Sequence, residues 1–338
     1  MNIPYSHDNH GIRIDHTTLT PRFSVTNESS LTDGITYLTE HGYAVFSDVL
    51  STDEVNNGKE LLWQFLENIP GYAIRRDNPS SWSSSWPGYK SHGVVNGDGI
   101  GQSEFMWTIR SNRNVKQVYS RIWNTNQLLV SFDGCGIYRD WRYNSQWKTK
   151  AGWYHVDQNP VLKPNLCCFQ GFVSLTDQNE TTGGLIVFPR THQRFHQLNG
   201  ISNRPRDFVM VPGTHPILDR GQAIGKLVQC QAGDLVVWDS RLVHCNAPAF
   251  QTTELIEDQP IDLLRAVAYI SMGPTIFIRE HTLDEFRKKR KALVQNNCTL
   301  NHWSTELNEA SSSDGLPKIS MKKFDAYQRA LILGTDID

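Results

Sequence analysis

The sequence GWYHVDQNPVLKPNLCCFQGFVSL, residues 152–175, contains two strand-like runs, GWYHV and LCCFQGFVSL, on either side of a polar segment rich in turn-forming residues. Similar runs, separated by turn residues, occur throughout residues 127–271; they are QLLVSF, GCGIY, GLIVF, KLVQC, DLVVW, LVHC and LLRAVAYIS. Many short strands in succession predict a β-sandwich or β-barrel. Several runs are almost wholly apolar, which indicates strands buried on both faces, either between two sheets or beneath helices.

Helical patterns flank this β-rich region. GYAVF at residues 42–46 is typical of a strand, and Ser51 is expected to cap a helix that has one apolar face. Apolar residues at helical spacing predict another helix at about 113–123. The predicted segments are an N-terminal arm at residues 1–35 and a single domain at 36–338, with a β core at about 127–273 and the last helices at about 281–333.

Residues 70–104 form a long segment rich in Gly, Ser, Pro and Trp. A segment of this length without elements of its own is often functional. Trp82 and Trp86 are therefore candidates for a lid over a substrate pocket, and equally for aromatic anchors that pack the loop onto the domain.

Composition excludes several classes of protein. The chain has 338 residues and a formal net charge of −2, so no overall positive field recruits nucleic acid. Six cysteines without a Cys-x-x-Cys spacing argue against zinc fingers and disulfide scaffolds. The polar start and the lack of a long apolar run predict a cytoplasmic protein that does not span a membrane.

The candidate chemistry lies in Trp153-Tyr154-His155-Val156-Asp157. Alternate residues of a strand point to the same face, so His155 and Asp157 can approach one ion while Val156 points away. His244, on a later strand-like unit, can supply a third ligand in a closed double sheet. Two imidazoles and one carboxylate on one side of an octahedron are typical of Fe(II) oxygenases, whereas zinc prefers a tetrahedral set.

Each of these three residues also has a common structural role as an alternative. His155 can be a hydrogen-bonded core histidine, Asp157 can cap the turn that follows it, and His244 can bond a neighbouring strand. An isolated His-x-Asp sequence does not separate these alternatives from a metal site.

Four motifs together resemble the phytanoyl-CoA dioxygenase family of Fe(II)/2-oxoglutarate oxygenases. They follow the order and spacing of that family over about residues 42–273. The motifs are GYAVFSDVLSTDEV at 42–55, WYHVDQ at 153–158, GGLIVFPRTH at 183–192 and AGDLVVWDSRLVH at 232–244. The chain departs from the family pattern at Arg190 and Thr191, where family members have Gly-Ser after the proline.

The resemblance implies a mainly β fold with flanking helices, built on a double-stranded β-helix (jelly-roll, cupin-like) core. It also implies an oxidoreductase, namely a dioxygenase that uses Fe(II), 2-oxoglutarate and O2 and releases succinate and CO2. The resemblance further implies that His155, Asp157 and His244 are the iron ligands. Related halogenases have Gly or Ala in place of Asp157, so hydroxylation or desaturation of a small organic or acyl-type molecule is expected. Two alternatives stay open: a metal-dependent oxygenase that does not use 2-oxoglutarate, and a catalytically silent ligand-binding protein.

Family members hold the distal carboxylate of 2-oxoglutarate with an arginine, because a planar guanidinium binds a carboxylate through two hydrogen bonds. Arg265 is the best match and lies 21 residues after His244. Arg241 is the competing candidate, but it lies on the opposite strand face from His244, where a surface ion pair is expected.

Two further polar residues are candidates for contacts with 2-oxoglutarate. Gln170 lies in an apolar run, where it needs hydrogen-bond partners from either the core backbone or the cosubstrate. Asn246 follows His244 on the same face, and its alternative role is that of a turn residue before Pro248.

Two other signals are given structural interpretations. The basic run Arg287–Lys291 lies within a helical pattern and is expected to be a solvated helix face. His192 and His196 have helical spacing but no third ligand, so surface or core roles are expected. The substrate and the oligomeric state are not encoded in any of these motifs.

Overall fold

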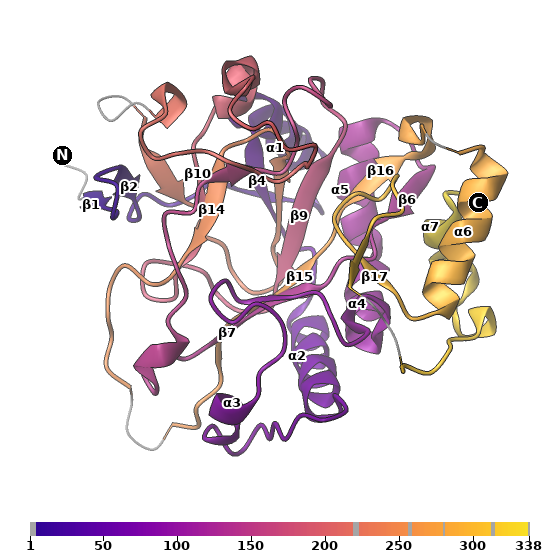
Figure 1. Ribbon diagram of the computed structural model, residues 1–338, viewed down its shortest axis with the longest axis horizontal. Coiled ribbons are helices and arrows are strands. Elements are labelled where there is room, and N and C mark those ends of the chain that lie inside the picture. The colour runs from indigo at the N-terminus through magenta and orange to yellow at the C-terminus, as the bar shows by residue number, and fades with distance from the viewer. Residues whose placement is uncertain (1–4, 219–222, 256–258, 280, 312–314, 337–338) are drawn as a thin grey trace.

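The structure is a computed structural model that describes residues 5–218, 223–255, 259–279, 281–311 and 315–336. Two large curled sheets form its centre, and helices pack around them (Figure 1). The prediction of a mainly β fold with flanking helices is confirmed.

The described strands form two seven-stranded sheets and two short pairs. The first sheet contains, in spatial order, β1 (Tyr5–His7), β2 (Arg13–Asp15), β12 (Gly225–Leu227), β10 (Gly184–Val187), β14 (His244–Ala247), β8 (His155–Val156) and β11 (Val209–Met210). The second contains β3 (Arg22–Ser24), β4 (Tyr43–Ser47), β13 (Leu235–Asp239), β9 (Phe169–Ser174), β15 (Leu263–Tyr269), β7 (Cys135–Arg139) and β5 (Val94–Val95). The pairs are β6 (Leu128–Val130) with β16 (Met272–Pro274) and β17 (Thr299–Leu300) with β18 (Glu309–Ser311).

Helices connect and cover these sheets. The α-helices are α1 (Glu28–His41), α2 (Thr52–Glu67), α3 (Ser81–Ser84), α4 (Glu104–Arg110), α5 (Arg113–Trp123), α6 (Leu283–Gln295) and α7 (Ala326–Leu333). The 3-10 helices are η1 (Ile100–Gln102), η2 (Ser145–Trp147), η3 (Thr191–Leu198), η4 (Pro216–Leu218), η5 (Thr275–Phe277) and η6 (Met321–Lys323). Among the described helices, none combines the length and the apolar character that crossing a bilayer demands.

Strand β13 shows why the strand-like runs are apolar on both faces. Val236 and Trp238 belong to a core cluster with residues of β10 and so lie between the sheets. Leu235 and Val237 belong to the cluster formed with the helices on the outer face. Because successive side chains alternate between faces, a strand covered on both sides needs apolar residues throughout.

The cap predicted at Ser51 is confirmed. The Ser51 hydroxyl accepts a hydrogen bond from Glu54 N at 3.3 Å, and the Glu54 carboxylate accepts one from Ser51 N at 2.8 Å. This reciprocal pair satisfies two donors that a helix start otherwise leaves free. It fixes the start of α2 directly after strand β4.

The N-terminal segment contributes strands to both large sheets. Strand β2 pairs in parallel with β12, and β3 pairs in parallel with β4. Helix α1 runs through the predicted boundary at residue 35. The division into an arm at 1–35 and a domain at 36–338 stays a prediction.

The Trp-rich segment packs into the core. Trp82 is fully buried, and its ring lies 5.1 Å from that of Trp63 and 5.7 Å from that of Trp147. Trp86 is also buried and packs on Trp82. These two residues are therefore packing anchors, and the lid stays a prediction.

The basic run on α6 is not a wholly solvated face, which corrects the expectation for Arg287–Lys291. Lys288, Lys289 and Lys291 are exposed, but Arg290 is completely buried. Its guanidinium donates to the carbonyl oxygens of Ile332, Ser304 and Val130 at 2.7, 3.0 and 2.6 Å. Arg290 thus ties α7 and the segment after β17 to the β6 strand.

We predict that Arg290→Met lowers the free energy of unfolding by about 3 kcal/mol, because it leaves buried carbonyl groups without donors. Urea unfolding monitored by circular dichroism measures the change. Lys291→Met, at an exposed position of the same helix, is the control and should change the free energy by less than about 0.5 kcal/mol. Equal effects of the two substitutions would contradict the role given to Arg290.

Candidate metal centre

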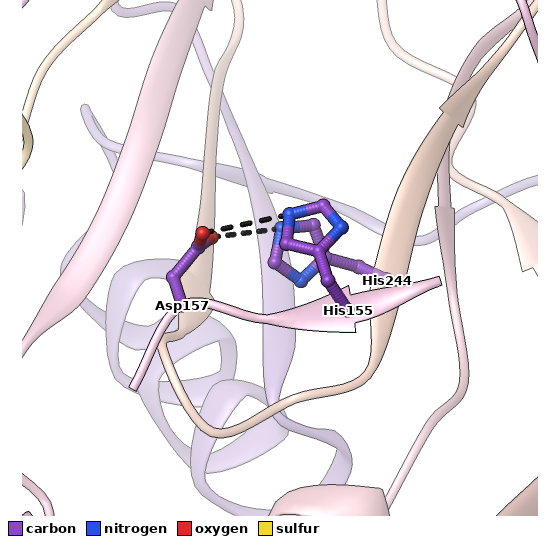
Figure 2. A group of neighbouring side chains, drawn as sticks. All are labelled: His155, Asp157 and His244. Carbon is purple, nitrogen blue, oxygen red and sulfur yellow. Dashed lines mark ion pairs between the residues drawn. The ribbon is translucent and has the colours of Figure 1, made fainter. Parts of the chain in front are cut away.

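His155, Asp157 and His244 meet inside the sandwich (Figure 2). His244 on β14 lies directly opposite His155 on β8 in the antiparallel pairing of these strands. One ligand atom from each of the three residues lies within 4.8 Å of the others, and all three residues are buried. Among the described residues, no other group of three or more His, Cys, Asp and Glu side chains is clustered in this way.

Strand alternation places these groups as the sequence predicted. Tyr154 and Val156 point into the apolar cluster on the outer face of the first sheet, so His155 points inward. The backbone N–H of Asp157 donates to Ser240 O at 3.0 Å, which fixes the chain just beyond the end of β8. The structure therefore brings together the three residues predicted as metal ligands.

Backbone carbonyls orient both imidazoles. His155 Nδ1 lies 3.1 Å from Trp153 O, and His244 Nδ1 lies 2.9 Å from Leu242 O. If each Nδ1 carries the proton and donates it to that carbonyl, each Nε2 presents a free electron pair. The Nε2 atoms lie 3.5 Å (His155) and 3.0 Å (His244) from the Asp157 carboxylate oxygens.

Electron pairs on two nitrogens and a carboxylate at such distances repel one another unless a cation lies among them. Burial, with the nearby His244 imidazole, lowers the pKa of His155 to about 3. Burial raises the Asp157 pKa, but the interactions of its carboxylate with the His155 and His244 side chains, which are attractive whenever an imidazole carries a proton on Nε2, outweigh burial and hold that pKa well below its ordinary value. At neutral pH the His155 imidazole is therefore neutral and the Asp157 carboxylate is ionised, which is the charge state that a divalent cation requires of these two residues.

Gln170 supports the carboxylate. Its Nε2 donates to Asp157 Oδ2 at 2.7 Å, and it projects from β9 toward the metal ligands. The sequence offered the core backbone or the cosubstrate as its partner; the structure shows a hydrogen bond to Asp157 instead. Such a hydrogen bond fixes the orientation of a ligand carboxylate.

The three residues line a cavity of about 950 Å³. Its aromatic wall includes Trp153, whose ring stacks on His155 at 4.8 Å, and Phe208, whose ring lies 4.5 Å from that of His155. A cavity of this size, mostly apolar with a few converging polar groups, is typical of sites for small molecules.

Arg265 and Asn246 line the same cavity. Arg265 is buried, its Nη1 donates to Asn246 Oδ1 at 2.8 Å, and its guanidinium carbon lies 3.8 Å from the centre of the Tyr138 ring. Asn246 Nδ2 also donates to the Tyr138 hydroxyl. Asn246 is therefore a strand residue of β14, and its alternative role as a turn residue is wrong.

Arg241 lies elsewhere. Its guanidinium makes a two-point ion pair with Asp239, at 2.9 and 2.6 Å, and it does not line the cavity. Arg265, and not Arg241, therefore lines the cavity that His155, Asp157 and His244 line, and Arg241 makes an ion pair, as the face argument predicted.

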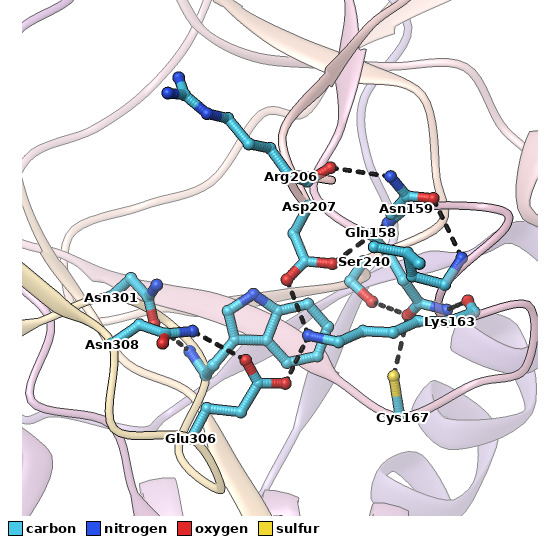
Figure 3. Close-up of polar contacts among 12 residues, drawn as sticks. Gln158, Asn159, Lys163, Cys167, Arg206, Asp207, Ser240, Asn301, Glu306 and Asn308 are labelled. Atoms are coloured by element: carbon cyan, nitrogen blue, oxygen red, sulfur yellow. Dashed lines mark hydrogen bonds and ion pairs between the residues drawn. The ribbon is translucent and has the colours of Figure 1, made fainter. Parts of the chain in front are cut away.

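A polar network ties together segments that the sequence did not connect (Figure 3). Lys163 Nζ makes ion pairs with Asp207, at 2.7 Å, and with Glu306. The same ammonium lies 3.5 Å from the centre of the Trp303 ring. Lys163 thus clamps the segments around residues 207 and 303, both of which line the cavity. Lys163, Asp207 and Glu306 lie far apart in the sequence and form no motif, so these ion pairs could not be predicted from it.

His192 and His196 do not form a metal site. His192 is buried, and its Nε2 lies 3.1 Å from Thr39 O, whereas His196 is exposed. The structural roles expected for them are confirmed.

Comparisons with known proteins agree on a family and a fold. The sequence profile described as Phytanoyl-CoA dioxygenase (PhyH) matches residues 38–248. A relative from Aspergillus versicolor, Ava biosynthesis cluster protein O, is 28% identical over 221 residues, which are 62% of this chain and 67% of that protein.

Two crystal structures share the fold. The alpha-ketoglutarate-dependent carbocyclase SnoK from nogalamycin biosynthesis is 17% identical, with a TM-score of 0.50 over 75% of this chain and 86% of that one. GlcNAc Inducible Gene 2 from Candida albicans is 14% identical, with a TM-score of 0.59 over 94% and 80% of the two chains. The predicted jelly-roll fold is confirmed.

We predict that His244→Ala weakens Fe(II) binding by more than about 100-fold, because it removes one of three ligands and leaves the carboxylate without a second imidazole. Anaerobic titration calorimetry measures the affinity. His196→Ala, at an exposed histidine, is the control and should bind Fe(II) like the unmodified protein. Unchanged binding by the His244 variant would contradict the assignment.

We also predict that Gln170→Leu weakens Fe(II) binding by about tenfold, because Asp157 loses its hydrogen-bond donor. The matched control is Gln178→Leu, since Gln178 lines the same cavity but donates to Ser174 Oγ at 3.0 Å. The same calorimetric titration compares the two variants. A larger loss with Gln178→Leu than with Gln170→Leu would show that Gln170 does not support the metal ligand.

Proposed function

The chain belongs to the phytanoyl-CoA dioxygenase family, and from this we propose that it is an Fe(II)- and 2-oxoglutarate-dependent oxygenase that oxidises a small organic molecule. The observation that carries the proposal is the presence, in one cavity, of three side chains that can hold a metal ion and of a buried arginine. The first fits Fe(II), and the second fits the carboxylate of a cosubstrate.

The ligand set fits Fe(II). Two imidazole nitrogens and one carboxylate oxygen leave other coordination positions open for a cosubstrate and O2, as in the oxygenases that use this set. Structural zinc sites instead close a tetrahedron with four protein ligands. Asp157 supplies the single protein charge that partly neutralises a divalent ion.

Arg265 fits an anionic cosubstrate. Among the described residues it has no carboxylate partner, its hydrogen bonds go to the neutral oxygens of Asn246 and Ala247, and its buried Nε has no acceptor. A buried cation without a counter-charge is costly. A dicarboxylate such as 2-oxoglutarate supplies the missing anion, and we assign to Asn246 the role of orienting the guanidinium.

When bound, iron and 2-oxoglutarate supply the oxidising power, because O2 is reduced as the cosubstrate is converted to succinate and CO2. The chain positions the reactants. His155, Asp157 and His244 hold the metal, Arg265 holds the far carboxylate, and the aromatic wall beside His155 excludes water and orients one C–H bond of the substrate. With Asp157 retained as a ligand, hydroxylation or desaturation is the proposed outcome.

The relatives are consistent with this proposal. The name of the Aspergillus versicolor protein refers to a biosynthesis cluster, and that of SnoK to an alpha-ketoglutarate-dependent enzyme. Both names fit a substrate that is a small molecule, which we propose for this chain.

We predict that the purified protein forms succinate from 2-oxoglutarate only when Fe(II) and O2 are both present, and that His244→Ala abolishes this activity. Chromatographic quantification of succinate measures it. The slow turnover that occurs without the natural substrate is sufficient for the assay if it is compared with a reaction lacking Fe(II). Fe(II) binding without any consumption of 2-oxoglutarate would favour a metal oxygenase of another type.

Arg265→Leu should raise the KM for 2-oxoglutarate by about 100-fold, because a charge-assisted two-point interaction is lost. Arg241→Leu removes the competing arginine and should leave that KM unchanged, since Arg241 is engaged by Asp239. The melting temperature of each variant, together with its Fe(II) affinity, identifies loss of folding as a separate cause. A raised KM in the Arg241 variant alone would overturn the assignment of Arg265.

A further inference from the structure

The segment of residues 202–208, which we call the gate segment, lies at the opening of the cavity that contains the candidate metal ligands. Residues 205–208 line that cavity, and all of them except Asp207 are also exposed to solvent. The ring of Phe208 lies 4.5 Å from the ring of His155. The gate segment therefore covers one side of a candidate metal ligand.

The gate segment is packed into the core only at its ends. Val209, directly after it, belongs to the apolar cluster on the outer face of the first sheet, and Ile201, directly before it, packs against the same cluster. Between these two residues the chain belongs to no helix or strand, and none of its residues is buried. A stretch with few buried contacts and no regular backbone pairing opens at a low cost in free energy.

Asn159 and Lys163 hold the gate segment (Figure 3). Asn159 Nδ2 donates to the carbonyl oxygens of Arg204 and Arg206 at 3.2 and 3.0 Å, and Asn159 N donates to Asp207 Oδ1 at 3.3 Å. Lys163 Nζ donates to Asp207 Oδ2 at 2.7 Å. These contacts involve side chains and an ion pair, and they are not a ladder of strand pairing.

The two holding residues are themselves fixed to the metal-site strands. Gln158 lies between Asp157 and Asn159 in the chain and is completely buried. Its Oε1 accepts a hydrogen bond from Ser240 Oγ at 2.6 Å, and its Nε2 donates to the backbone carbonyl of Lys163. The side of the contact that Asn159 and Lys163 supply is therefore rigid, and the gate segment is the side that can move.

The Lys163 ammonium does not depend on Asp207 alone. It also pairs with Glu306, and it lies 3.5 Å from the centre of the Trp303 ring. When Asp207 leaves, the ammonium keeps one carboxylate and one aromatic ring, while the Asp207 side chain, already 23% exposed, gains water. Such a contact breaks at a modest cost, whereas breaking a buried pair leaves an uncompensated charge.

Resting on the proposed function, we propose that residues 202–208 form a gate that opens to admit the metal ion and the substrate, and that the pairing of Asp207 with Lys163 latches it closed. In the closed state, Phe208 covers His155 and limits the access of water to the cavity. In the open state, the contacts of Asp207 are broken while the three candidate metal ligands keep their places on the strands.

The kinetics of metal exchange test the gate. The complete chain, loaded anaerobically with Fe(II), is mixed with ferrozine, a chelator that becomes coloured when it captures released Fe(II). Uptake of Fe(II) by the metal-free chain is followed by tryptophan fluorescence. Asp207→Asn should raise the rate constants of release and uptake about tenfold each, because the latch loses a charge-assisted hydrogen bond. The dissociation constant should change by less than about twofold, since a gate alters both rates equally.

Glu306→Gln is the matched control, because it removes the other carboxylate that Lys163 binds and leaves Asp207 in place. Its two rate constants should stay within about twofold of those of the unmodified protein. Equal acceleration by both substitutions would indicate a general structural clamp. A change in the dissociation constant as large as the change in rates would indicate that Asp207 supports the metal ligands. Either result would overturn the gate.

Proteolysis tests the gate without any metal. Trypsin cleaves after Arg206 only when the segment has opened locally, and Lys163→Met leaves the cleaved bond unchanged. This variant should be cleaved after Arg206 about tenfold faster, whereas Lys163→Arg keeps the charge and should be cleaved slowly. Lys322→Met, at an exposed position of η6, should be cleaved like the unmodified protein. Mass spectrometry of the early fragments measures the rate.

Failure of the gate and failure of the proposed function are distinguishable. If the unmodified protein binds no Fe(II), the proposed function fails, and cleavage after Arg206 alone then decides the gate. If Fe(II) binds but Asp207→Asn exchanges it at the unmodified rate, the gate is overturned. Cleavage of Lys163→Met no faster than that of Lys322→Met overturns it as well.

Discussion

The close approach of two imidazole nitrogens to one buried carboxylate is the constraint on which the rest of this structure depends. The three side chains meet only if strands β8 and β14 keep their register. A slip of one residue in β14 turns His244 and Asn246 to the outer face and brings Cys245 and Ala247 inward. Two apolar clusters, one on the outer face of the first sheet and one between the sheets, oppose such a slip. Each would lose buried apolar side chains if a strand moved by one residue.

Much of the fold follows from local patterns. Alternation in β13 and the cap at Ser51 are short-range signals, so the sandwich and the start of α2 could be read from the sequence. The strands of the N-terminal segment could not, because three residues such as Arg13–Asp15 have no measurable period, and their place is defined by pairing with β12 and β1. The segment around Trp82 is a similar case. Its composition is that of a loop, and only the neighbouring Trp63 and Trp147 show that it packs into the core.

The grouping of His155, Asp157 and His244 could be predicted because two of them lie two residues apart on a strand and the third lies in a motif shared with a family. The alternation of side chains along a strand also distinguished Arg265 from Arg241, because it placed Arg241 on the opposite face from His244. The partner of Gln170 was missed, since an amide in an apolar run can bond any nearby acceptor and the sequence does not say that Asp157 is the nearest. The hydrogen bond from Leu300 N to Phe132 O also gave no signal, because periodicity cannot express a contact across more than 160 positions.

The candidate metal ligands lie on or beside strands, whereas much of the cavity wall lies on the segments that connect strands. The ligands sit on or directly beside paired strands, whereas much of the wall comes from connecting segments that Lys163 holds together, including Trp303 in a region beyond the match to the family profile. Insertions and substitutions in those connections leave the ladder of strand pairing untouched. Changes in these segments can therefore alter which substrate binds while the residues on the strands stay the same. The same segments are the positions at which substrate specificity can be redesigned in the laboratory.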